Sequence, residues 1–579
     1  ILGPEHLETD IFMRTIGYSA DELQAGFAAQ DEECRALLRG YVTGINRRIA
    51  EIFEDPTQLP FEYAALAGQG LPLTYLLRFW TVEDVLAWGA LLQRNFDPEA
   101  LDQSQITNAA LLQYLQTVFP ADALAMFNDL RWTNDPEAQT MIVDAAGPEE
   151  GPPEDDKEGW RPSDLPPQLR DACKAMEHRR ERIRRNLKKL NAKVKMGSYA
   201  WAVSGKKTAS GRPIIYSGPQ MGFSVPSIVT EGSIRAAGLN ISGMTVPGIP
   251  GIIIGRTPHH AWSMQVGHAH TTDYYFEHPA FVEFHRLETI RVAGDDDVVV
   301  LPVYRTPRGP VVSPLPFDPD TYGTEPDPAN PIVTWRYAHW GHEFDMAKAL
   351  LRLARARSMD EFGEGIEYVA VCQHFCYADR DGNIAYWMSG RDPVRPPGEY
   401  RLPQGILGLP QDWDDDALKP RSTARNPTRG FFGGWNNKTS PWYDNAYNSN
   451  NDIYGPFHRA HVIEELLSRP GKLSFEEIRD LAVDIAATDS INGGGNPWAF
   501  VAPTFRAAVE ADGLTPTRKR ALDVLVNWDG HFVDDWVAGN KRTPAWVISD
   551  AWIREVIRLT FEDELPKDRD DDGEWTGTY

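Results

Sequence analysis

The stretch of sequence that decides the fold is GSYAWAVSGKKTASGRP, residues 197–213. Residues 198–205 are rich in strand-forming residues and end at a glycine, which predicts a short β-strand that begins at Ser198. Short segments of the same texture follow at residues 212–218, 250–256 and 260–267, and a hairpin pattern spans residues 374–388. From Ser198 onward, the sequence therefore predicts a block of short strands separated by Gly and Pro.

Amphipathic helical patterns lie on both sides of this block. Ser19 and Glu22 form a capping-box pattern ahead of a long amphipathic run, and residues 81–96 and 108–127 predict two more helices. Helical patterns return at residues 343–357, 457–468, 474–487 and 545–560. Helices, then strands, then helices predict an α+β fold in which helices enclose antiparallel sheets.

The segment directly before the first strand, residues 144–197, has the composition of a spacer. It begins with the acidic, Pro- and Gly-rich run AAGPEEGPPEDDKEG and then becomes strongly basic between residues 178 and 196. Such composition buries little apolar surface, so we expect an exposed linker that ends at Gly197–Ser198. A basic helix can also bind nucleic acid or a membrane surface. We expect neither partner, because the whole chain carries a net charge of −25 and no apolar run long enough to span a bilayer.

Cleavage of the bond between Gly197 and Ser198 would give Ser198 distinctive chemistry. A serine hydroxyl is a poor nucleophile near neutral pH unless a base lies within hydrogen-bonding distance. A newly freed α-amino group has a pKa of about 7.7–8.0, which suits it to accept that proton. One residue would then supply both the nucleophile and the base.

Several separate elements resemble the penicillin acylase family of N-terminal-nucleophile hydrolases. The run from Ser198 to Pro213, followed by Gly218-Pro-Gln-Met-Gly, resembles the start of the family's β-chain. Further matching elements are Pro250–Gly255, Trp262–Gly267, Trp435-Asn436-Asn437, Asp452 with Arg459, and Phe127–Pro136. The resemblance implies one interwoven αββα sandwich, formed by an α-chain (residues 1–143), an excised spacer (144–197) and a β-chain (198–579). It also implies an acylase that cleaves linear N-acyl amides, an α/β heterodimer made from one precursor, and a periplasmic or secreted location.

The resemblance also assigns roles to individual residues. Ser198 is the nucleophile, and the backbone N–H of Val266 with the side-chain amide of Asn436 forms an oxyanion hole. Gln220 holds the serine region, and Arg459 orients Asn436. The acyl pocket is implied to be apolar, with the side chains of Leu92, Phe96, Met221, Ile254 and Met264. No cofactor is needed for the chemistry.

A structural calcium ion is common in the resembled family, and its ligands would be Asp273, Asp452 and Gln105. Calcium prefers carboxylate and carbonyl oxygens. Gln105 stands where the family has Glu, and His270 stands where Asp is common. We therefore expect a site that is weak, absent or occupied differently.

Two alternatives compete with the acylase hypothesis. His259, His260, His268 and His270 fall within twelve residues, and clustered histidines are natural zinc ligands, so a metal-dependent hydrolase is one alternative. The other is an unprocessed, non-catalytic precursor, because nothing in a continuous sequence proves cleavage. The four cysteines form no CxxC pair and leave the redox compartment open.

Overall fold

The structure is a computed structural model of the chain. It describes all residues except 1–3, 69–73, 75–76, 102–103, 132–136, 144–164, 166–168, 190–196, 222–226, 237, 293–297, 314–319, 321–322, 326, 328, 397, 406–411, 446–459, 489–497, 527, 529, 531–542, 564–567, 570–574 and 577–579.

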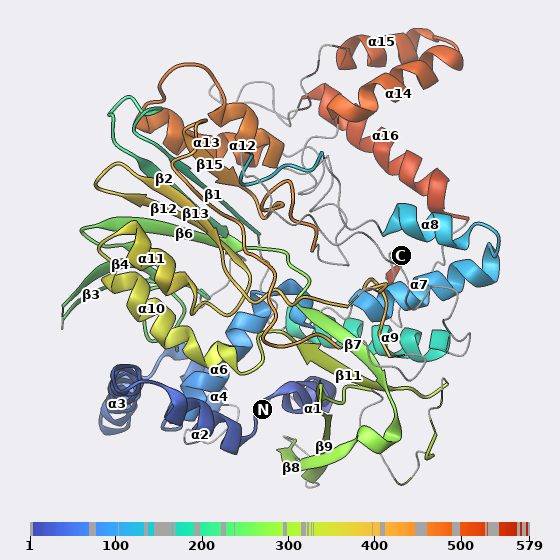
Figure 1. Cartoon of the computed structure of the whole chain (residues 1–579). Helices are drawn as coiled ribbons and strands as arrows, with labels where there is room; N and C mark the ends of the chain where they lie inside the picture. The colour runs from blue at the N-terminus through green and yellow to red at the C-terminus, as the bar shows by residue number, and fades with distance from the viewer. Residues whose placement is uncertain are drawn as a thin grey trace.

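Two antiparallel sheets form the centre of the molecule (Figure 1). The first has the order β15-β1-β2, with β15 at Phe431–Gly434, β1 at Gly197–Val203 and β2 at Ile214–Gln220. The second has seven strands in the order β14-β13-β12-β6-β5-β4-β3. Their bounds are Thr423–Arg425 (β14), Ile384–Met388 (β13), Gln373–Asp379 (β12), His260–Val266 (β6), Ile254–Arg256 (β5), Leu239–Thr245 (β4) and Thr230–Ala236 (β3). The predicted strands and the predicted hairpin are confirmed within a few residues.

Side chains of β1 alternate between two different cores, because successive residues of a strand point to opposite faces. Trp201 and Val203 pack with buried apolar residues of α12 (Ala460–Leu467) and α13 (Phe475–Thr488). Ala202 instead packs with Cys376 of β12 and Tyr386 of β13. Helices therefore cover the outer face of the first sheet, and its inner face lies on the second sheet.

The outer face of the second sheet is covered by another pair of helices, α10 (Met346–Arg355) and α11 (Met359–Ile366). Trp262 of β6 and Tyr377 of β12 pack with Leu353 and Phe362 of these helices. The core thus has four layers in the order helix, sheet, sheet, helix, which confirms the predicted α+β plan with antiparallel sheets (Figure 1).

Helices of the first 130 residues pack beside this core. They are α1 (Leu7–Ile16), α2 (Ala20–Ala29), α3 (Glu32–Glu54), α4 (Phe61–Gly68), α6 (Val82–Asn95), α7 (Ser104–Val118) and α8 (Ala123–Leu130). The capping box of Ser19 and Glu22 is present at the start of α2. The prediction of a single helix over residues 108–127 is wrong, because the chain forms two helices, α7 and α8. Pro120 lies between them and separates them, since proline disfavours a helical conformation of the preceding residue.

The expectation of an exposed linker before Ser198 is wrong for residues 169–189. They form a helix, α9 (Leu169–Lys189), which packs against α7. Leu169, Cys173, Met176 and Ile183 are buried in the same apolar cluster as Phe127 of α8. These four residues recur at helical spacing, so α9 buries one apolar stripe although its second half is rich in arginine.

The end of the predicted α-chain lies between the two sheets. Met141 and Ile142 belong to the inter-sheet core with Ala202 and Phe432. The backbone N–H of Met141 donates to the carbonyl of Lys438 at 2.9 Å, and that of Ile142 donates to Thr439 at 3.0 Å. Residues before and after the predicted cleavage point therefore pack in one core and share backbone hydrogen bonds.

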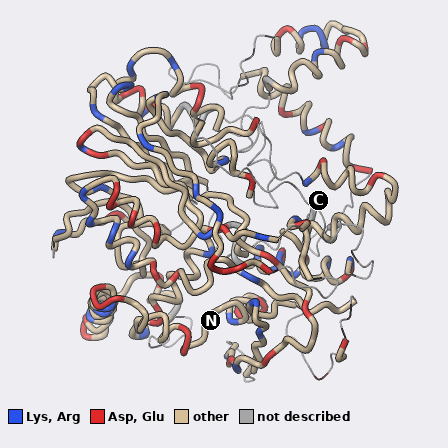
Figure 2. Tube along the Cα trace, viewed as in Figure 1, with Lys and Arg blue, Asp and Glu red and all other residues tan. Residues whose placement is uncertain are grey.

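Other described strands and helices lie outside the two central sheets, and residues 272–277 and 332–337 among them are almost entirely buried. They comprise the sheet β10-β9-β8 (Gly309–Pro310, Val298–Thr306, Glu283–Arg291), the pair β11-β7 (Ile332–Tyr337, Thr272–Glu277), α14 (Trp498–Ala511), α15 (Pro516–Leu525) and α16 (Pro544–Phe561). Basic and acidic residues are interspersed along α3 and α15 (Figure 2). Within the described part of the chain, none of the helices has the length and apolar character that a membrane crossing requires.

Candidate active site

Ser198 lies at the start of β1, at the edge of the inner face of the first sheet. Gly197 pairs with Gln220 and Ser198 pairs with Pro219 on β2, so the ladder holds both sides of the predicted cleavage point. The parity of the strand places the Ser198 side chain on the same face as Ala202, toward the second sheet. Ser198 is 9% exposed and lines a pocket, so its hydroxyl lies at a cavity rather than within a packed core.

Asn436 connects Ser198 to the second sheet. It follows β15, is buried, and has a φ of 66°, a left-handed conformation that is uncommon for a residue other than glycine. Its Oδ1 accepts a hydrogen bond from the backbone N–H of Ser198 at 3.0 Å. Its backbone N–H donates to Gln265 Oε1, and its Nδ2 donates to the carbonyl of Val266, both at 2.9 Å. Three hydrogen bonds thus hold the unusual backbone conformation in place.

The backbone N–H of Val266 faces the same space. In the antiparallel ladder, Gly267 donates to Cys372, so the polar groups of Val266 point away from β12. On that other side, β5 pairs with β6 only at Trp262 and Ala261. The carbonyl of Val266 already meets Asn436, and its N–H points to the same side. Both predicted oxyanion donors therefore lie next to Ser198.

Gln220 supports the same region from β2. Its Oε1 accepts a hydrogen bond from Trp435 Nε1 at 2.7 Å, one residue before Asn436. Trp435 also donates its backbone N–H to Asn437 Oδ1 at 2.9 Å. Gln220 thus links β2, where it pairs with Gly197, to the turn that carries Asn436.

The predicted partner Arg459 and the predicted ligand Asp452 lie outside the described residues.

The pocket beside Ser198 is mainly apolar and has a cavity volume of about 30 Å³. Phe96, Met221, Ile254 and Met264 line it, as the resemblance implied. Its other lining residues are Pro219, Val229, Met244, Thr245, Val246, Ile253, Gln265, Val266 and Gln373. Leu92 is not among these lining residues: it is buried in a cluster with Val246 and Leu350, and its contact with the acyl group stays a prediction.

The four histidines of the zinc hypothesis do not come together. His260 begins β6 and His268 follows its end, and the intervening strand rises about 3.3 Å per residue, which separates the two pairs by roughly 25 Å. His260 Nε2 lies 3.0 Å from the carbonyl of Leu353, and burial lowers its pKa to about 4. Among the described residues, no group of three or more His, Cys, Asp or Glu side chains could hold a metal ion. The geometry contradicts the hypothesis of one metal site built from this cluster.

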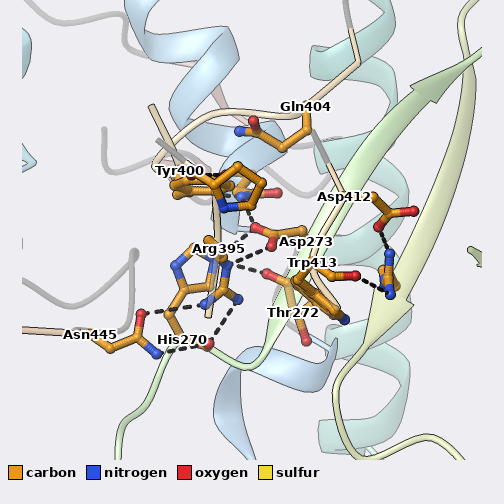
Figure 3. Close-up of polar contacts among 12 residues, drawn as sticks. His270, Thr272, Asp273, Arg395, Tyr400, Gln404, Asp412, Trp413 and Asn445 are labelled. Atoms are coloured by element: carbon orange, nitrogen blue, oxygen red, sulfur yellow. Dashed lines mark hydrogen bonds and ion pairs between the residues drawn. The ribbon is translucent and has the colours of Figure 1, made fainter. Parts of the chain in front are cut away.

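Asp273 and Gln105 do lie together. Arg395 completes their site and points at the carboxylate of Asp273 (Figure 3). Asp273 Oδ2 accepts a hydrogen bond from Arg395 Nε at 2.7 Å, and Oδ1 accepts one from Gln105 Nε2 at 2.6 Å. His270 Nε2 lies 3.0 Å from the same Oδ1. Arg395 also donates to the carbonyl of His270 at 2.8 Å, and its guanidinium lies 4.8 Å from the ring centre of Trp413.

These residues do not fit a calcium ion. Gln105 Oε1 accepts from the backbone N–H of Tyr274 at 2.7 Å, which turns the NH₂ end of the amide toward Asp273. Both oxygens of the Asp273 carboxylate therefore face nitrogen donors rather than other oxygen ligands. Burial alone would raise the pKa of Asp273, but the positive charge of Arg395 holds that pKa well below its usual range. The expectation that Gln105 is a ligand is wrong for this arrangement, and the role of Asp452 stays a prediction.

The roles of three residues in this region were not predicted from the sequence. Gln265 holds the backbone of Asn436, Gln373 lines the pocket, and Arg395 neutralises Asp273. Gln265 directly precedes Val266 on a predicted strand, which was a usable signal. Gln373 and Arg395 carry no local signal, because they reach their partners only through the tertiary fold.

A serine at the start of a strand of an antiparallel sheet, beside a buried amide and an apolar pocket, is an arrangement that N-terminal-nucleophile hydrolases have. Sequence comparison agrees: residues 1–578 match the penicillin amidase family. The chain belongs to the penicillin amidase family. It is therefore a hydrolase of the acylase type.

Individual relatives are distant. Penicillin G acylase from Escherichia coli is 24% identical over 98% of this chain and 68% of its own length. The acyl-homoserine lactone acylase QuiP from Pseudomonas aeruginosa is 24% identical over 98% of this chain and 64% of its own length. Penicillin acylase 2 proenzyme from Pseudomonas sp. (strain SE83) is 23% identical over 96% of this chain and 65% of its own length. The chain thus spans about two thirds of the length of these curated relatives.

Among solved structures, a thermostable penicillin G acylase from Alcaligenes faecalis has a similar fold. The TM-score is 0.53 with 23% sequence identity, and the match covers 64% of this chain and 66% of the other. The similarity extends to the mixed α+β architecture with antiparallel sheets.

Proposed function

We propose that this protein is an amide hydrolase that removes an N-acyl group from an amine, with Ser198 as an N-terminal nucleophile after cleavage at Gly197–Ser198. The observation that carries the proposal is the hydrogen bond from the backbone N–H of Ser198 to Asn436 Oδ1, beside an apolar pocket. Cleavage would convert that N–H into an α-amino group already held by Asn436. The core would then be the αββα sandwich of the N-terminal-nucleophile class.

The proposed reaction uses Ser198 twice. Its Oγ attacks the carbonyl carbon of the substrate amide while its α-amino group accepts the hydroxyl proton, directly or through a water molecule. The tetrahedral intermediate collapses, the C–N bond breaks, and the amine leaves with that proton. Water then hydrolyses the ester on Ser198 by the same route, releasing the carboxylic acid.

The oxyanion of the intermediate would be stabilised by two neutral donors. One is the backbone N–H of Val266, which faces away from β12. The other is the side-chain amide of Asn436, whose Nδ2 lies 2.9 Å from the carbonyl of Val266. Donors held in advance at the developing charge are typically worth about 10²–10³ in rate each. Gln220 would keep them in register through Trp435, and we assign the orientation of Asn436 in part to Arg459.

The acyl group is proposed to be hydrophobic, since apolar side chains dominate the pocket. The cavity of about 30 Å³ is small, so we propose that side chains around it adjust when an acyl group enters. Met221, Met244 and Met264 are unbranched and adjust readily. The names of the relatives point to two groups of amides, penicillins and acyl-homoserine lactones, and both have an N-acyl chain that such a pocket could take.

We further propose that the processed enzyme is an α/β heterodimer and that it acts outside the cytoplasm. Met141 and Ile142 lie between the sheets and would keep the α-chain attached after cleavage. Because α9 is packed in an apolar cluster, we propose that this helix also stays with the enzyme after processing.

Hydrolysis of synthetic N-acyl amides tests the proposed function. We expect phenylacetyl and hexanoyl amides of a fluorogenic amine to release the amine, and a substrate of equal length with a terminal carboxylate to react at least about tenfold more slowly, because burying an unpaired charge is costly. Release measured by fluorescence, with the acid identified by mass spectrometry, would support an acylase. Absence of hydrolysis across the panel by a correctly processed sample would contradict the proposal.

A further inference from the structure

Three side-chain polar atoms of residues that line the pocket have no partner within the described part of the chain: Gln373 Oε1, Thr245 Oγ1 and Gln265 Nε2. Gln373 begins β12, is 1% exposed, and lines the pocket together with Ser198. Its Oε1 is buried and accepts no hydrogen bond from any described residue. Buried carbonyl oxygens are nearly always hydrogen-bonded, so this atom requires an explanation.

The orientation of the Gln373 amide is fixed by its other end. Nε2 donates to the carbonyl of Phe96 at 2.9 Å. Phe96 caps the C-terminus of α6, where carbonyl groups lack partners within the helix. A carbonyl only accepts hydrogen bonds, so turning the amide around would place two oxygens against each other. The atom without a partner is therefore an acceptor.

The backbone of Gln373 is also fixed. Its N–H donates to Ser389 Oγ at 3.1 Å, and its carbonyl accepts from the N–H of Ser389 at 2.9 Å. Val266 lies opposite Gln373 in the ladder between β6 and β12. The acceptor is therefore held rigidly on the strand that neighbours the proposed oxyanion site.

We propose that Gln373 is a specificity-determining residue whose Oε1 accepts a hydrogen bond from a hydroxyl group on the acyl chain. This inference rests on the proposed acylase function and names its substrate class: N-acyl amides whose hydrophobic acyl group carries a hydroxyl. None of the residues that line the pocket is charged, so a neutral donor suits it better than an ammonium group. A hydrocarbon chain in the pocket offers no donor to this acceptor, whereas a hydroxyl group does.

Leaving a buried acceptor without a partner has a predictable effect on selectivity. A site that binds a substrate hydroxyl discriminates against the analogue lacking it, because the protein group is left unpaired. We expect kcat/KM to be roughly 10- to 100-fold higher for the hydroxylated acyl group than for the matched hydrocarbon.

Matched pairs of substrates test the inference. Hexanoyl and phenylacetyl amides of one fluorogenic amine are compared with their analogues hydroxylated at each chain carbon in turn and, for phenylacetyl, at the para position. The wild-type enzyme should prefer at least one hydroxylated analogue by tenfold or more. The variant Gln373→Met, which keeps a similar volume, should lose that preference mainly by accelerating hydrolysis of the hydrocarbon substrate.

Gln30→Met is the matched control and should leave the ratio of the two substrates unchanged, because Gln30 is a buried glutamine whose Oε1 also lacks a partner among the described residues and which does not line the pocket. Thr245→Val tests the other possible partner in the pocket, Thr245 Oγ1. Loss of the preference in Thr245→Val but not in Gln373→Met would overturn the assignment. Equal hydrolysis of both members of every pair by the wild-type enzyme would also overturn it, whether or not the variants fold. No hydrolysis of any substrate would instead contradict the proposed function itself.

Discussion

Replacing Ser198 by alanine is expected to lower amide hydrolysis by at least about 10⁴-fold and to leave the chain uncut, because one hydroxyl serves both reactions. Alanine keeps the backbone N–H that donates to Asn436 and removes only the hydroxyl at the pocket. The fold should therefore persist. Fluorogenic hydrolysis and denaturing gel electrophoresis measure the two effects on one sample.

The other Gly–Ser pair of the chain provides the control. Ser233 lies on β3 with an exposed side chain and follows Gly232, so Ser233→Ala should be processed and active like the wild type. Ser198→Cys retains a nucleophile and is expected to keep processing. If Ser198→Ala still hydrolysed amides at the wild-type rate, Ser198 would have no part in the mechanism.

Replacing Arg395 by leucine is expected to lower the free energy of unfolding by about 3–5 kcal/mol, because it strands the buried carboxylate of Asp273 without its positive partner. Asp273 is fully buried, and the side chain of Arg395 is 6% exposed. Urea denaturation followed by tryptophan fluorescence measures the change. The double variant Arg395→Leu with Asp273→Asn should recover part of the loss, since it removes the stranded charge as well.

The control variant for this prediction replaces an exposed arginine, and a titration with EDTA and calcium is a second measurement. Arg380 has a side chain that is 63% exposed, so Arg380→Leu should change stability by no more than about 0.5 kcal/mol. Excess EDTA or millimolar calcium should leave the unfolding of the wild type unchanged, because a guanidinium already neutralises Asp273. A large stabilisation of the wild type by calcium would contradict this account of the site.

The strands around Ser198 were predictable because their signals are local. Residues 197–203 combine strand-forming residues with a glycine boundary, and the hairpin at residues 373–388 turns at Gly382, whose φ of 101° suits glycine. Ser198 and Asn436 could be found because short motifs carry them. Their contact across 238 residues needed the structure.

The features that were missed depend on burial and tertiary contact. The charged composition of residues 144–197 as a whole predicted a linker, but the stripe formed by Leu169, Cys173, Met176 and Ile183 could have been found from its helical spacing. The pairing of Arg395 with Asp273 joins positions 122 residues apart and leaves no pattern in a single sequence. The same holds for Gln373, whose amide is oriented by a carbonyl 277 residues earlier.

We expect Ser198 to become the N-terminus of a separate chain, and N-terminal sequencing of the purified protein measures this. The account predicts two bands on a denaturing gel, the larger of which begins Ser-Tyr-Ala-Trp. A single intact band in a preparation that hydrolyses amides, or a new terminus at another residue, would contradict it.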